Sequence, residues 1–397
     1  MSNFVQPLNP VVTQMAADKL LDFQLQVRDI PNLVRLTFGE PGFAVDERIK
    51  QALYAAVEGD RSHYAESQGE LALRKAAVAY FNQHANLAYE NEDNVIVTLG
   101  VTEAINVVFQ TLLSAGDGIL VPEPAYGPYF MSIDLARGKR VGVDTTADGF
   151  KLTPAAVEKA LTQADVPVKA ILMNYPNNPT GVTYTRDELQ ALAEVFEKHN
   201  IWVISDEIYS TLTYDYEHVS LAELLPRQTV MINGLSKSHA MTGYRIGFIL
   251  GDKAVIDEMQ KVHGAWDFAI PTFIQDAATV ALTEVTEAPG EMRDAYRARR
   301  DRTVPQLLAA GFDVVNPAGA FYLFAKIPVD LGSDGDAFAM DLATNGGVAV
   351  IPGSGFAESA AAYIRISYAA DDADLDEGVA RLVKRVAELR AEGVRFD

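Results

Sequence analysis

The middle third of the chain alternates short apolar segments with segments of helical length, and this alternation constrains the fold more than any other feature. The apolar segments, rich in β-branched residues, are Val95–Thr98, Ile119–Pro122, Arg140–Asp144, Ala170–Asn174, Trp202–Ser205, Val230–Asn233 and Ile246–Leu250. Amphipathic stretches separate most of them; Arg186–His199, for example, carries apolar residues at helical spacing. This pattern predicts an α/β fold with a mostly parallel seven-stranded sheet covered by helices on both faces. Because no helix-length stretch precedes Ile246–Leu250, we expect it to be the antiparallel member.

The two ends of the chain depart from this pattern and predict a smaller α+β domain. From about Met292 a long charged helix is expected, followed by short strands and a terminal helix near Leu375–Glu392. The expected strands are Gly311–Val315, Gly319–Ile327, Val348–Ile351 and Ile364–Tyr368. Residues 1–45 precede the sheet without strand–helix alternation, so we expect them to form an arm and part of this small domain. The predicted organisation is therefore 1–45, a large domain at 46–290, and a small C-terminal domain at 291–397.

Composition excludes several classes of function. Lys and Arg number 33 and Asp and Glu 54, so the net charge of −21 repels nucleic acid and anionic lipid. The absence of cysteine excludes disulfides and thiolate metal sites, and the six histidines show no paired ligand spacing, so no metal is expected. No apolar stretch reaches the roughly 18 residues of a membrane span, and the N-terminus lacks a signal-peptide pattern. These features predict a cytoplasmic protein.

Residues that follow the strands are candidates for a site, because ligands of an open parallel sheet bind beyond the carboxyl ends of its strands. Gly100, Val101 and Thr102 follow the first predicted strand and open a helix whose backbone N–H groups suit a phosphate. An ordinary turn would have the same sequence. Tyr126 follows the second strand and either supports a flat ring or packs internally. Asn178 follows the fourth strand in a turn rich in Asn and Pro, where its amide is free to bind a ligand.

Charged residues follow the fifth and sixth strands. Asp206, with Tyr209 three residues later, ends the fifth strand, where a carboxylate faces the ligand crevice or caps a helix. Lys237, preceded by Ser236, follows the sixth strand, an unusual position because lysines are mostly exposed. Desolvation and a nearby cation would lower its pKa and make the amine nucleophilic toward carbonyls. Arg245 lies eight residues further on and can hold a phosphate through two hydrogen bonds.

This combination meets the requirements of pyridoxal 5′-phosphate. Lys237 would form the Schiff base, and Asp206 would keep the pyridine nitrogen protonated so that the ring withdraws electrons. Asn178 and Tyr209 would donate hydrogen bonds to the ring oxygen, and Tyr126 would stack on the ring. The Gly100 turn and Arg245 would form the phosphate cup.

Several motifs resemble those of class I/II aminotransferases, which are fold type I pyridoxal-phosphate enzymes, and the overall pattern is most similar to bacterial aromatic-type or broad-range members. The segment Ser236–Gly247 resembles the family's lysine signature. Further family-like segments are Leu36–Gly42, Tyr64–Gly69, Asn177–Gly181, Ser205–Tyr209, Pro317–Tyr322, Ile351–Phe356 and Tyr363–Ser367. The resemblance covers about residues 30–380, nearly the whole chain.

The resemblance implies roles for residues that spacing does not assign. It implies that Arg365 binds the α-carboxylate of the substrate and that Gly39 lies in a loop that closes over the substrate. It further implies a homodimer with shared active sites, in which Tyr64 reaches the cofactor phosphate of the neighbouring subunit. The large domain would be the one that binds the cofactor.

The chain departs from the family pattern at two points. Gly234 stands where members often carry a phosphate-binding serine, three residues before the lysine, so Ser236 or Thr102 is expected to take over that role. The helix after Gly100 also lacks the lysine with which some aspartate-specific relatives bind a second carboxylate. This difference argues against a strict aspartate enzyme.

The predicted function is transfer of an amino group from an L-amino acid, aromatic or broad-range, to a 2-oxo acid such as 2-oxoglutarate. A lyase or synthase acting at Cβ or Cγ on the same fold would use nearly the same residues and remains the alternative. A nicotinamide dehydrogenase is disfavoured because no G-x-G-x-x-G opens a strand–helix unit. A DNA-binding regulator on this fold is disfavoured because fewer than 100 residues precede the first strand and none form a basic helix–turn–helix.

Overall fold

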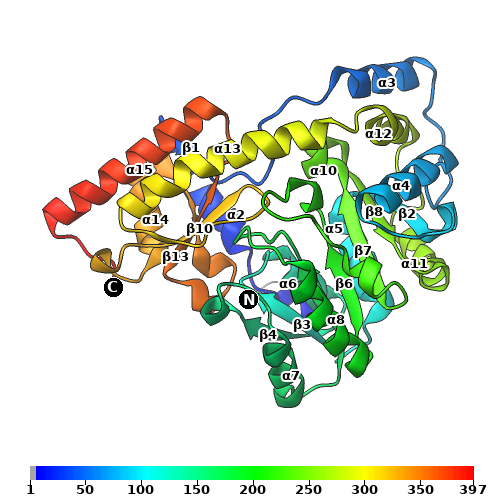
Figure 1. Ribbon diagram of the computed structural model, residues 1–397, viewed down its shortest axis with the longest axis horizontal. Coiled ribbons are helices and arrows are strands. Elements are labelled where there is room, and N and C mark those ends of the chain that lie inside the picture. Colours follow the sequence, from blue (N-terminus) through cyan, green and yellow to red (C-terminus); the bar gives the residue numbers. More distant parts are fainter. Residues whose placement is uncertain (1–5) are drawn as a thin grey trace.

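A seven-stranded sheet forms the centre of the larger part of the protein (Figure 1). The structure is a computed structural model that describes residues 6–397; residues 1–5, the beginning of the predicted N-terminal arm, lie outside the described residues. The strands are β2 (Val95–Leu99), β3 (Gly118–Glu123), β4 (Lys139–Asp144), β5 (Val168–Asn174), β6 (Trp202–Asp206), β7 (Thr229–Gly234) and β8 (Ile246–Leu250). Their order is β2-β8-β7-β6-β5-β3-β4, and β8 is the one strand that runs antiparallel to the other six. The predicted α/β fold, its seven strands and the antiparallel place of the last are therefore confirmed.

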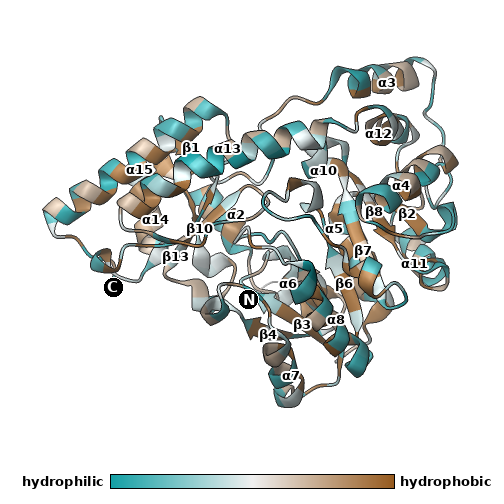
Figure 2. Cartoon of the chain, viewed as in Figure 1, coloured by the Kyte–Doolittle hydropathy of each residue, from teal (hydrophilic) through white to brown (hydrophobic). Residues whose placement is uncertain are grey.

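Both faces of the sheet are buried by helices. Ile204 and Ile232 point to one face, whereas their neighbours Val203 and Met231 point to the other, as the two-residue period of a strand requires. The first face is covered by α5 (Gly100–Leu112), α6 (Pro128–Leu135) and α11 (Lys253–Trp266). The second is covered by α4 (Leu71–His84), α7 (Pro154–Gln163), α8 (Arg186–His199), α9 (Leu221–Leu224) and α12 (Thr272–Glu284), and α3 (Glu47–Glu58) packs on the outside of α12. Figure 2 shows the apolar strands between helices whose outer surfaces are polar.

The helix α8 illustrates how local sequence fixes these elements. The side chain of Thr185 accepts a hydrogen bond from the Glu188 N–H, and the Glu188 carboxylate accepts one from the Thr185 N–H. This capping box satisfies two backbone donors at the start of the helix. Asn200 adopts the left-handed conformation and ends it. The bounds of α8 are those predicted from its apolar period.

The C-terminal part has its own antiparallel sheet, with strand order β12-β13-β10-β9. The strands are β9 (Asp313–Val314), β10 (Tyr322–Lys326), β12 (Ile351–Pro352) and β13 (Tyr363–Ser367). The helices beside it are α13 (Ala288–Ala309), α14 (Gly335–Thr344) and α15 (Asp372–Glu392). One continuous apolar core joins these elements and also includes Leu20, Phe23 and Leu36 from the N-terminal segment.

The N-terminal segment contains α1 (Pro10–Gln14), α2 (Lys19–Gln26) and β1 (Val34–Arg35), none of which was predicted. β1 pairs in parallel with β11 (Val348–Ala349). The prediction of one strand at Val348–Ile351 is therefore wrong. Val348 and Ala349 pair with β1, whereas Ile351 and Pro352 pair with β13, so neighbouring residues belong to two sheets. The domain boundaries after residues 45 and 290 stay a prediction.

Short helices complete the chain. They are α10 (Leu235–Ser238) and the 3₁₀ turns at Glu92–Asn94, Thr146–Asp148, Ser210–Leu212, Thr242–Tyr244, Val329–Leu331, Gly353–Gly355 and Glu358–Ala360. Within residues 6–397, no helix combines the length and the apolar character that a membrane crossing requires.

Candidate active site

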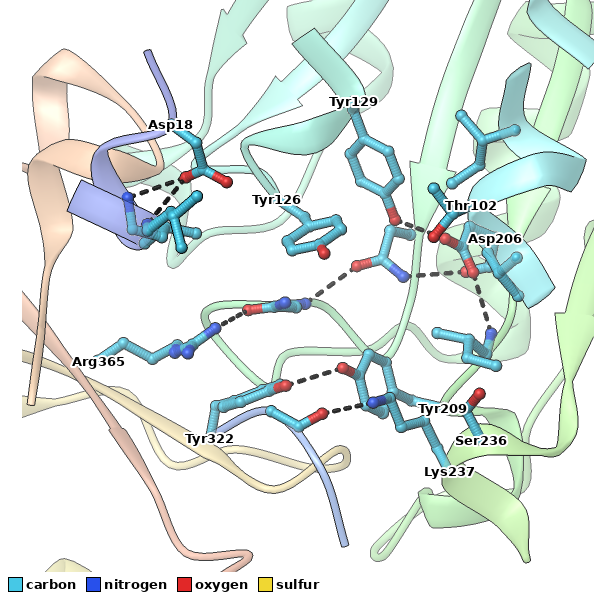
Figure 3. A pocket seen from close by; sticks show the side chains of 18 of the residues that line it. Asp18, Thr102, Tyr126, Tyr129, Asp206, Tyr209, Ser236, Lys237, Tyr322 and Arg365 are labelled. Carbon is cyan, nitrogen blue, oxygen red and sulfur yellow. Dashed lines mark hydrogen bonds between the residues drawn. The ribbon is translucent and has the colours of Figure 1, made fainter. Parts of the chain in front are cut away.

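A cavity of about 410 Å³ lies at the carboxyl ends of β5, β6 and β7, where the smaller part of the protein meets the sheet. Eleven of the predicted site residues line it: Gly39, Val101, Thr102, Tyr126, Asn178, Asp206, Tyr209, Ser236, Lys237, Arg245 and Arg365. Gly100 and Tyr64 do not line it. Figure 3 shows that the side chains come from opposite walls, with Asp206 and Lys237 facing Arg365 and Tyr322 across the cavity. The sheet edge thus gathers residues that are far apart in sequence, as the position of the strand ends predicts.

Asp206 is a buried carboxylate at the last position of β6, with 2% of its surface exposed. Tyr129 donates a hydrogen bond from Oη to its Oδ2 at 2.6 Å, and the Ile208 N–H donates to Oδ1 at 3.1 Å. Burial raises the pKa of Asp206 to about 6, against the opposing effect of the Tyr129 hydrogen bond. Its hydrogen-bond partners are neutral, so a cationic group in the cavity would gain a buried counter-ion here.

Lys237 lies in α10, one turn after the end of β7, because the chain passes from strand to helix at Gly234. Burial lowers its pKa from 10.5 to about 8. The positive charges of Arg245 and Arg365 add to this shift, whereas Glu40 and Asp206 oppose it. The ammonium donates a hydrogen bond to the Gly39 carbonyl. A lysine with this pKa has a larger fraction of free, nucleophilic amine near neutral pH than an exposed one.

Arg365 stands in β13, in the wall opposite Lys237, and only 4% of its surface is exposed. Its Nη1 donates to Asn178 Oδ1 at 2.8 Å and its Nη2 to the Thr37 carbonyl at 2.9 Å. The guanidinium carbon lies 4.4 Å from the centre of the Tyr322 ring. The buried Nε has no hydrogen-bond partner among the described residues. A buried guanidinium with an unused donor is suited to an anionic ligand such as a carboxylate.

Four tyrosines line the space between these charges. The hydroxyl groups of Tyr209 and Tyr322 form a hydrogen bond, with 2.9 Å between their oxygen atoms. The ring of Tyr126 meets that of Tyr129 edge to face, with centroids 5.4 Å apart. Burial raises the pKa of Tyr209 and Tyr126 above the usual value, so both hydroxyl groups are protonated donors at neutral pH. They can therefore donate to oxygen atoms of a ligand.

The start of α5 forms a cradle beside Arg245. Gly100 has φ +76°, and a Cβ atom added there would lie 2.7 Å from Nη2 of Arg245. Glycine thus permits the arginine to lie against the first turn of the helix, where unpaired N–H groups attract anions. Thr102 and Ser236 line the cavity beside this turn. The structure therefore brings together the residues predicted to bind a phosphate, although Gly100 leaves room rather than lining the cavity, and their role in binding a phosphate stays a prediction.

The structure gives a steric reason for glycine at position 234, which the sequence did not reveal. A Cβ atom at this position would lie 2.7 Å from the Ile246 carbonyl oxygen and 3.3 Å from the Cα atom of Gly247. The contacts are with backbone atoms of β8, which cannot give way as a flexible side chain can. A serine at position 234 is therefore incompatible with this arrangement, which leaves Thr102 and Ser236 as the hydroxyl groups at the cup.

Tyr64 lies outside the cavity of its own chain and is 88% exposed. Its ring packs edge to face against Phe268, with centroids 5.3 Å apart. An exposed aromatic pair of this kind is unusual for a surface that faces only water. Its predicted role in a neighbouring subunit's site stays a prediction.

The structure adds lining residues that the sequence did not single out as site residues. They are Asp18, Leu20, Leu21, Gln24, Thr37, Ile105, Tyr129, Asn174, Ile208 and Tyr322. Tyr129 lies shortly after β3 and Asn174 is the last residue of β5, so the rule of strand ends could have found both. Asp18 caps α2, and the sequence of this helix gives no sign that it lines the cavity.

Comparison with known proteins places these features in a family context. Residues 31–382 match the family described as "Aminotransferase class I and II". A probable N-acetyl-LL-diaminopimelate aminotransferase of Bacillus subtilis is 39% identical over 383 residues, covering 96% of each chain. An aspartate/prephenate aminotransferase of Thermus thermophilus is 36% identical, covering 97% of this chain and 98% of its own.

Solved structures agree with this match. A double mutant of Thermus thermophilus aspartate aminotransferase superposes with a TM-score of 0.90 at 34% identity, covering 96% of this chain and all of the other. An aromatic aminotransferase from Pyrococcus horikoshii superposes with a TM-score of 0.86 at 33% identity, covering 94% of this chain and 99% of its own. The relatives therefore share a reaction type but differ in the amino acids that their names give.

Proposed function

The chain belongs to the class I and II aminotransferases, and from that premise we propose that it transfers the amino group of an L-amino acid to a 2-oxo acid with pyridoxal 5′-phosphate as cofactor. The observation that carries the proposal is the pairing, in one cavity, of Lys237 with a lowered pKa and Asp206 as a buried acid. Arg365, across the cavity, supplies the third element that any α-amino acid requires, a partner for its carboxylate.

The residues present fit this cofactor. Asp206 is a buried carboxylate with neutral partners, which suits a protonated pyridine nitrogen. The space left by Gly100 beside Arg245, with Thr102 and Ser236, suits a phosphate. Tyr209 and Asn178 would donate to the ring oxygen, and Tyr126 would lie against the ring.

When bound, the cofactor supplies an electron-withdrawing ring that makes the Cα–H bond of the amino acid acidic. Lys237 would hold the cofactor covalently in the resting enzyme. Its amine, once displaced by the amino group of the substrate, would take the proton from the substrate Cα, as a base whose pKa lies near the working pH can. Arg365 would orient the substrate through its carboxylate, and Asp206 would stabilise the positive charge at the ring nitrogen.

A half-reaction screen tests the proposal. The enzyme carrying its cofactor is mixed with each L-amino acid in the absence of any 2-oxo acid, and the visible absorbance of the cofactor is followed. We expect loss of that absorbance and release of the corresponding 2-oxo acid, and recovery on addition of 2-oxoglutarate or another 2-oxo acid. Products cleaved at Cβ or Cγ would contradict the proposal and identify a lyase.

Arg365→Lys should lower kcat/KM for every amino acid and 2-oxo acid by at least about 10-fold, or about 1.4 kcal/mol. Lysine keeps the charge but loses the planar fork that pairs with a carboxylate. Steady-state kinetics with several substrates measure the effect, and Arg302→Lys, on α13 and outside the cavity, is the control. Loss confined to one class of substrate would show that Arg365 recognises the side chain instead.

We further propose that the enzyme is a homodimer in which Tyr64 completes the site of the neighbouring subunit. Tyr64→Phe alone should weaken cofactor binding by about 10-fold, the value of one hydrogen bond to a charged group. Lys237→Ala alone should be inactive. A mixed dimer of the two variants contains one intact site if Tyr64 acts in the neighbouring subunit, and none if it acts in its own.

Activity at limiting cofactor, measured after subunits of the two variants are mixed and exchanged, distinguishes these cases. We expect the mixture to exceed the activity of either variant alone. A sedimenting species of monomer mass with full activity, or a mixture without recovery, would overturn the shared site.

A further inference from the structure

One wall of the cavity has no role in the function proposed above. It is formed by α2 and its N-cap residue Asp18, and α2 itself contributes Leu20, Leu21 and Gln24. Figure 3 shows Asp18 beyond Tyr126, on the Arg365 side of the cavity and away from Lys237. A substrate with its carboxylate on Arg365 and its amino group toward Lys237 would have this wall left for its side chain. On this placement, the residues of this wall would contact the substrate side chain, which is the part that differs between amino acids.

Asp18 is the charged group of this wall. Its Oδ1 caps α2 by accepting hydrogen bonds from the N–H groups of Leu20, at 2.9 Å, and Leu21, at 3.3 Å. Within residues 6–397, Oδ2 has no hydrogen-bond partner and Asp18 forms no ion pair. One carboxylate oxygen is therefore fixed by the helix, while the other remains an available acceptor.

In the function proposed above, each cationic side chain of the cavity already has a role. The cations among the described lining residues are Lys237, Arg245 and Arg365. The first two serve the cofactor and the third serves the carboxylate that all α-amino acids share. A second carboxylate at the end of a side chain would thus meet Asp18 without a further cation among the described lining residues to offset the repulsion.

The charge of Asp18 reaches the interior of the cavity. Burial raises the pKa of the Tyr126 phenol, and the negative charges of Asp18 and Asp206 raise it further, whereas Arg365 opposes them. Tyr126 therefore lies within the field of both acids. Leu20 and Leu21 supply apolar surface at the same wall, which suits the apolar stem of a long side chain.

We propose that Asp18 is a specificity residue that favours substrates whose side chain has an apolar stem and ends in a hydrogen-bond donor, and disfavours those that end in a carboxylate. Phenolic, indole and ammonium groups are donors of this class. The inference rests on the proposed function, because it requires an amino acid held by Arg365 in this cavity.

Asp18→Asn tests the proposal without removing the helix cap. Asparagine caps helices about as well as aspartate, so its Oδ1 can keep the bonds to Leu20 and Leu21. The free acceptor oxygen is then replaced by an NH₂ donor. We expect the ratio of kcat/KM for glutamate over glutamine to rise by about 10-fold and the ratio for tyrosine over phenylalanine to fall by about 5-fold. The efficiency of 2-oxoglutarate as acceptor should rise as well.

Asp22→Asn is the matched control. Asp22 lies in the first turn of the same helix, is exposed, and does not line the cavity. The substitution removes the same charge from the same helix, so a change in net charge or helix stability would affect both variants alike. Both substrate ratios should stay at their wild-type values in this variant.

Binding of unreactive analogues gives a readout independent of turnover. Calorimetric titration of the cofactor-loaded enzyme compares glutarate with its monoamide, and 3-(4-hydroxyphenyl)propanoate with 3-phenylpropanoate. Asp18→Asn should strengthen glutarate binding relative to the monoamide and remove the preference for the hydroxylated ring.

The outcomes separate the two proposals. A wild-type enzyme that converts no L-amino acid in the half-reaction screen would overturn the proposed function and this inference together. An active enzyme whose substrate ratios and analogue affinities are the same in Asp18→Asn as in the wild type, or change equally in Asp22→Asn, would overturn the role of Asp18 alone.

Discussion

Replacing Lys237 with alanine should lower kcat for transamination by at least about 10⁴-fold, the upper end of the contribution of a single acid–base residue, because in the proposed mechanism the same amine also holds the cofactor. The structure gives the physical reason. Lys237 follows a buried strand, and burial lowers its pKa to about 8, so the free amine is available near neutral pH. No other lysine lines the cavity within the described part of the chain.

Two measurements check this expectation. Borohydride reduction of the wild-type enzyme followed by peptide mass mapping should place the pyridoxyl group on Lys237. Lys261→Ala, which removes an exposed lysine of α11, should retain the activity and the label of the wild type. A pyridoxyl group on another lysine, or substantial turnover by Lys237→Ala, would show that the assignment is wrong.

Asp206→Asn should lower kcat by at least about 10³-fold while leaving the fold intact. Asparagine has nearly the same shape and can keep the contacts with Tyr129 and the Ile208 N–H. It cannot supply the negative charge that stabilises a protonated ring nitrogen in a water-poor site, where such electrostatic effects are large. Single-turnover absorbance traces measure the rate, and thermal unfolding checks the fold.

The shift in the pKa of Asp206 sharpens this test. With its pKa raised to about 6 by burial, the carboxylate is ionised at pH 7.5 but takes up a proton as the pH falls through 6. In the protein without cofactor, Asp206 binds its proton more tightly in the folded chain than in the unfolded chain. The free energy of unfolding that this group contributes therefore decreases as the pH rises from about 4 to 6. Asp206→Asn should remove that contribution. Near-normal turnover by the variant would refute the role of the carboxylate.

The sheet and the residues at its edge could be predicted because both depend on the local pattern of apolar and polar residues in the sequence. The segments that became β5, β6 and β7 are short, apolar and rich in β-branched residues, and they are buried on both faces. Once their carboxyl ends were placed, the positions of Asp206 and Lys237 followed from chain connectivity.

What could not be predicted depends on packing between segments distant in sequence. Arg365 itself was assigned through the family resemblance, but the hydrogen bonds that hold it could not be predicted, because Asn178 and Thr37 lie 187 and 328 residues away and no sequence period relates these residues. The same holds for α2 and β1, which are short and are positioned by the C-terminal core. Val348–Ile351 was predicted as one strand because the sequence does not show that its first two residues pair with one sheet and its last residue with another.

The tight approach of Gly234 to β8 has a consequence for how this enzyme can change. Because a side chain at this position would collide with the Ile246 carbonyl oxygen, a single substitution to serine cannot be accepted until the neighbouring backbone has moved. That shift would also disturb Gly247, which is itself closely packed: a Cβ atom added at Gly247 would lie 2.7 Å from the Val101 nitrogen. If Thr102 and Ser236 bind the cofactor phosphate as proposed, natural or directed evolution would adjust those contacts through these two residues, whereas a serine at position 234 becomes possible only in variants that alter β8 first.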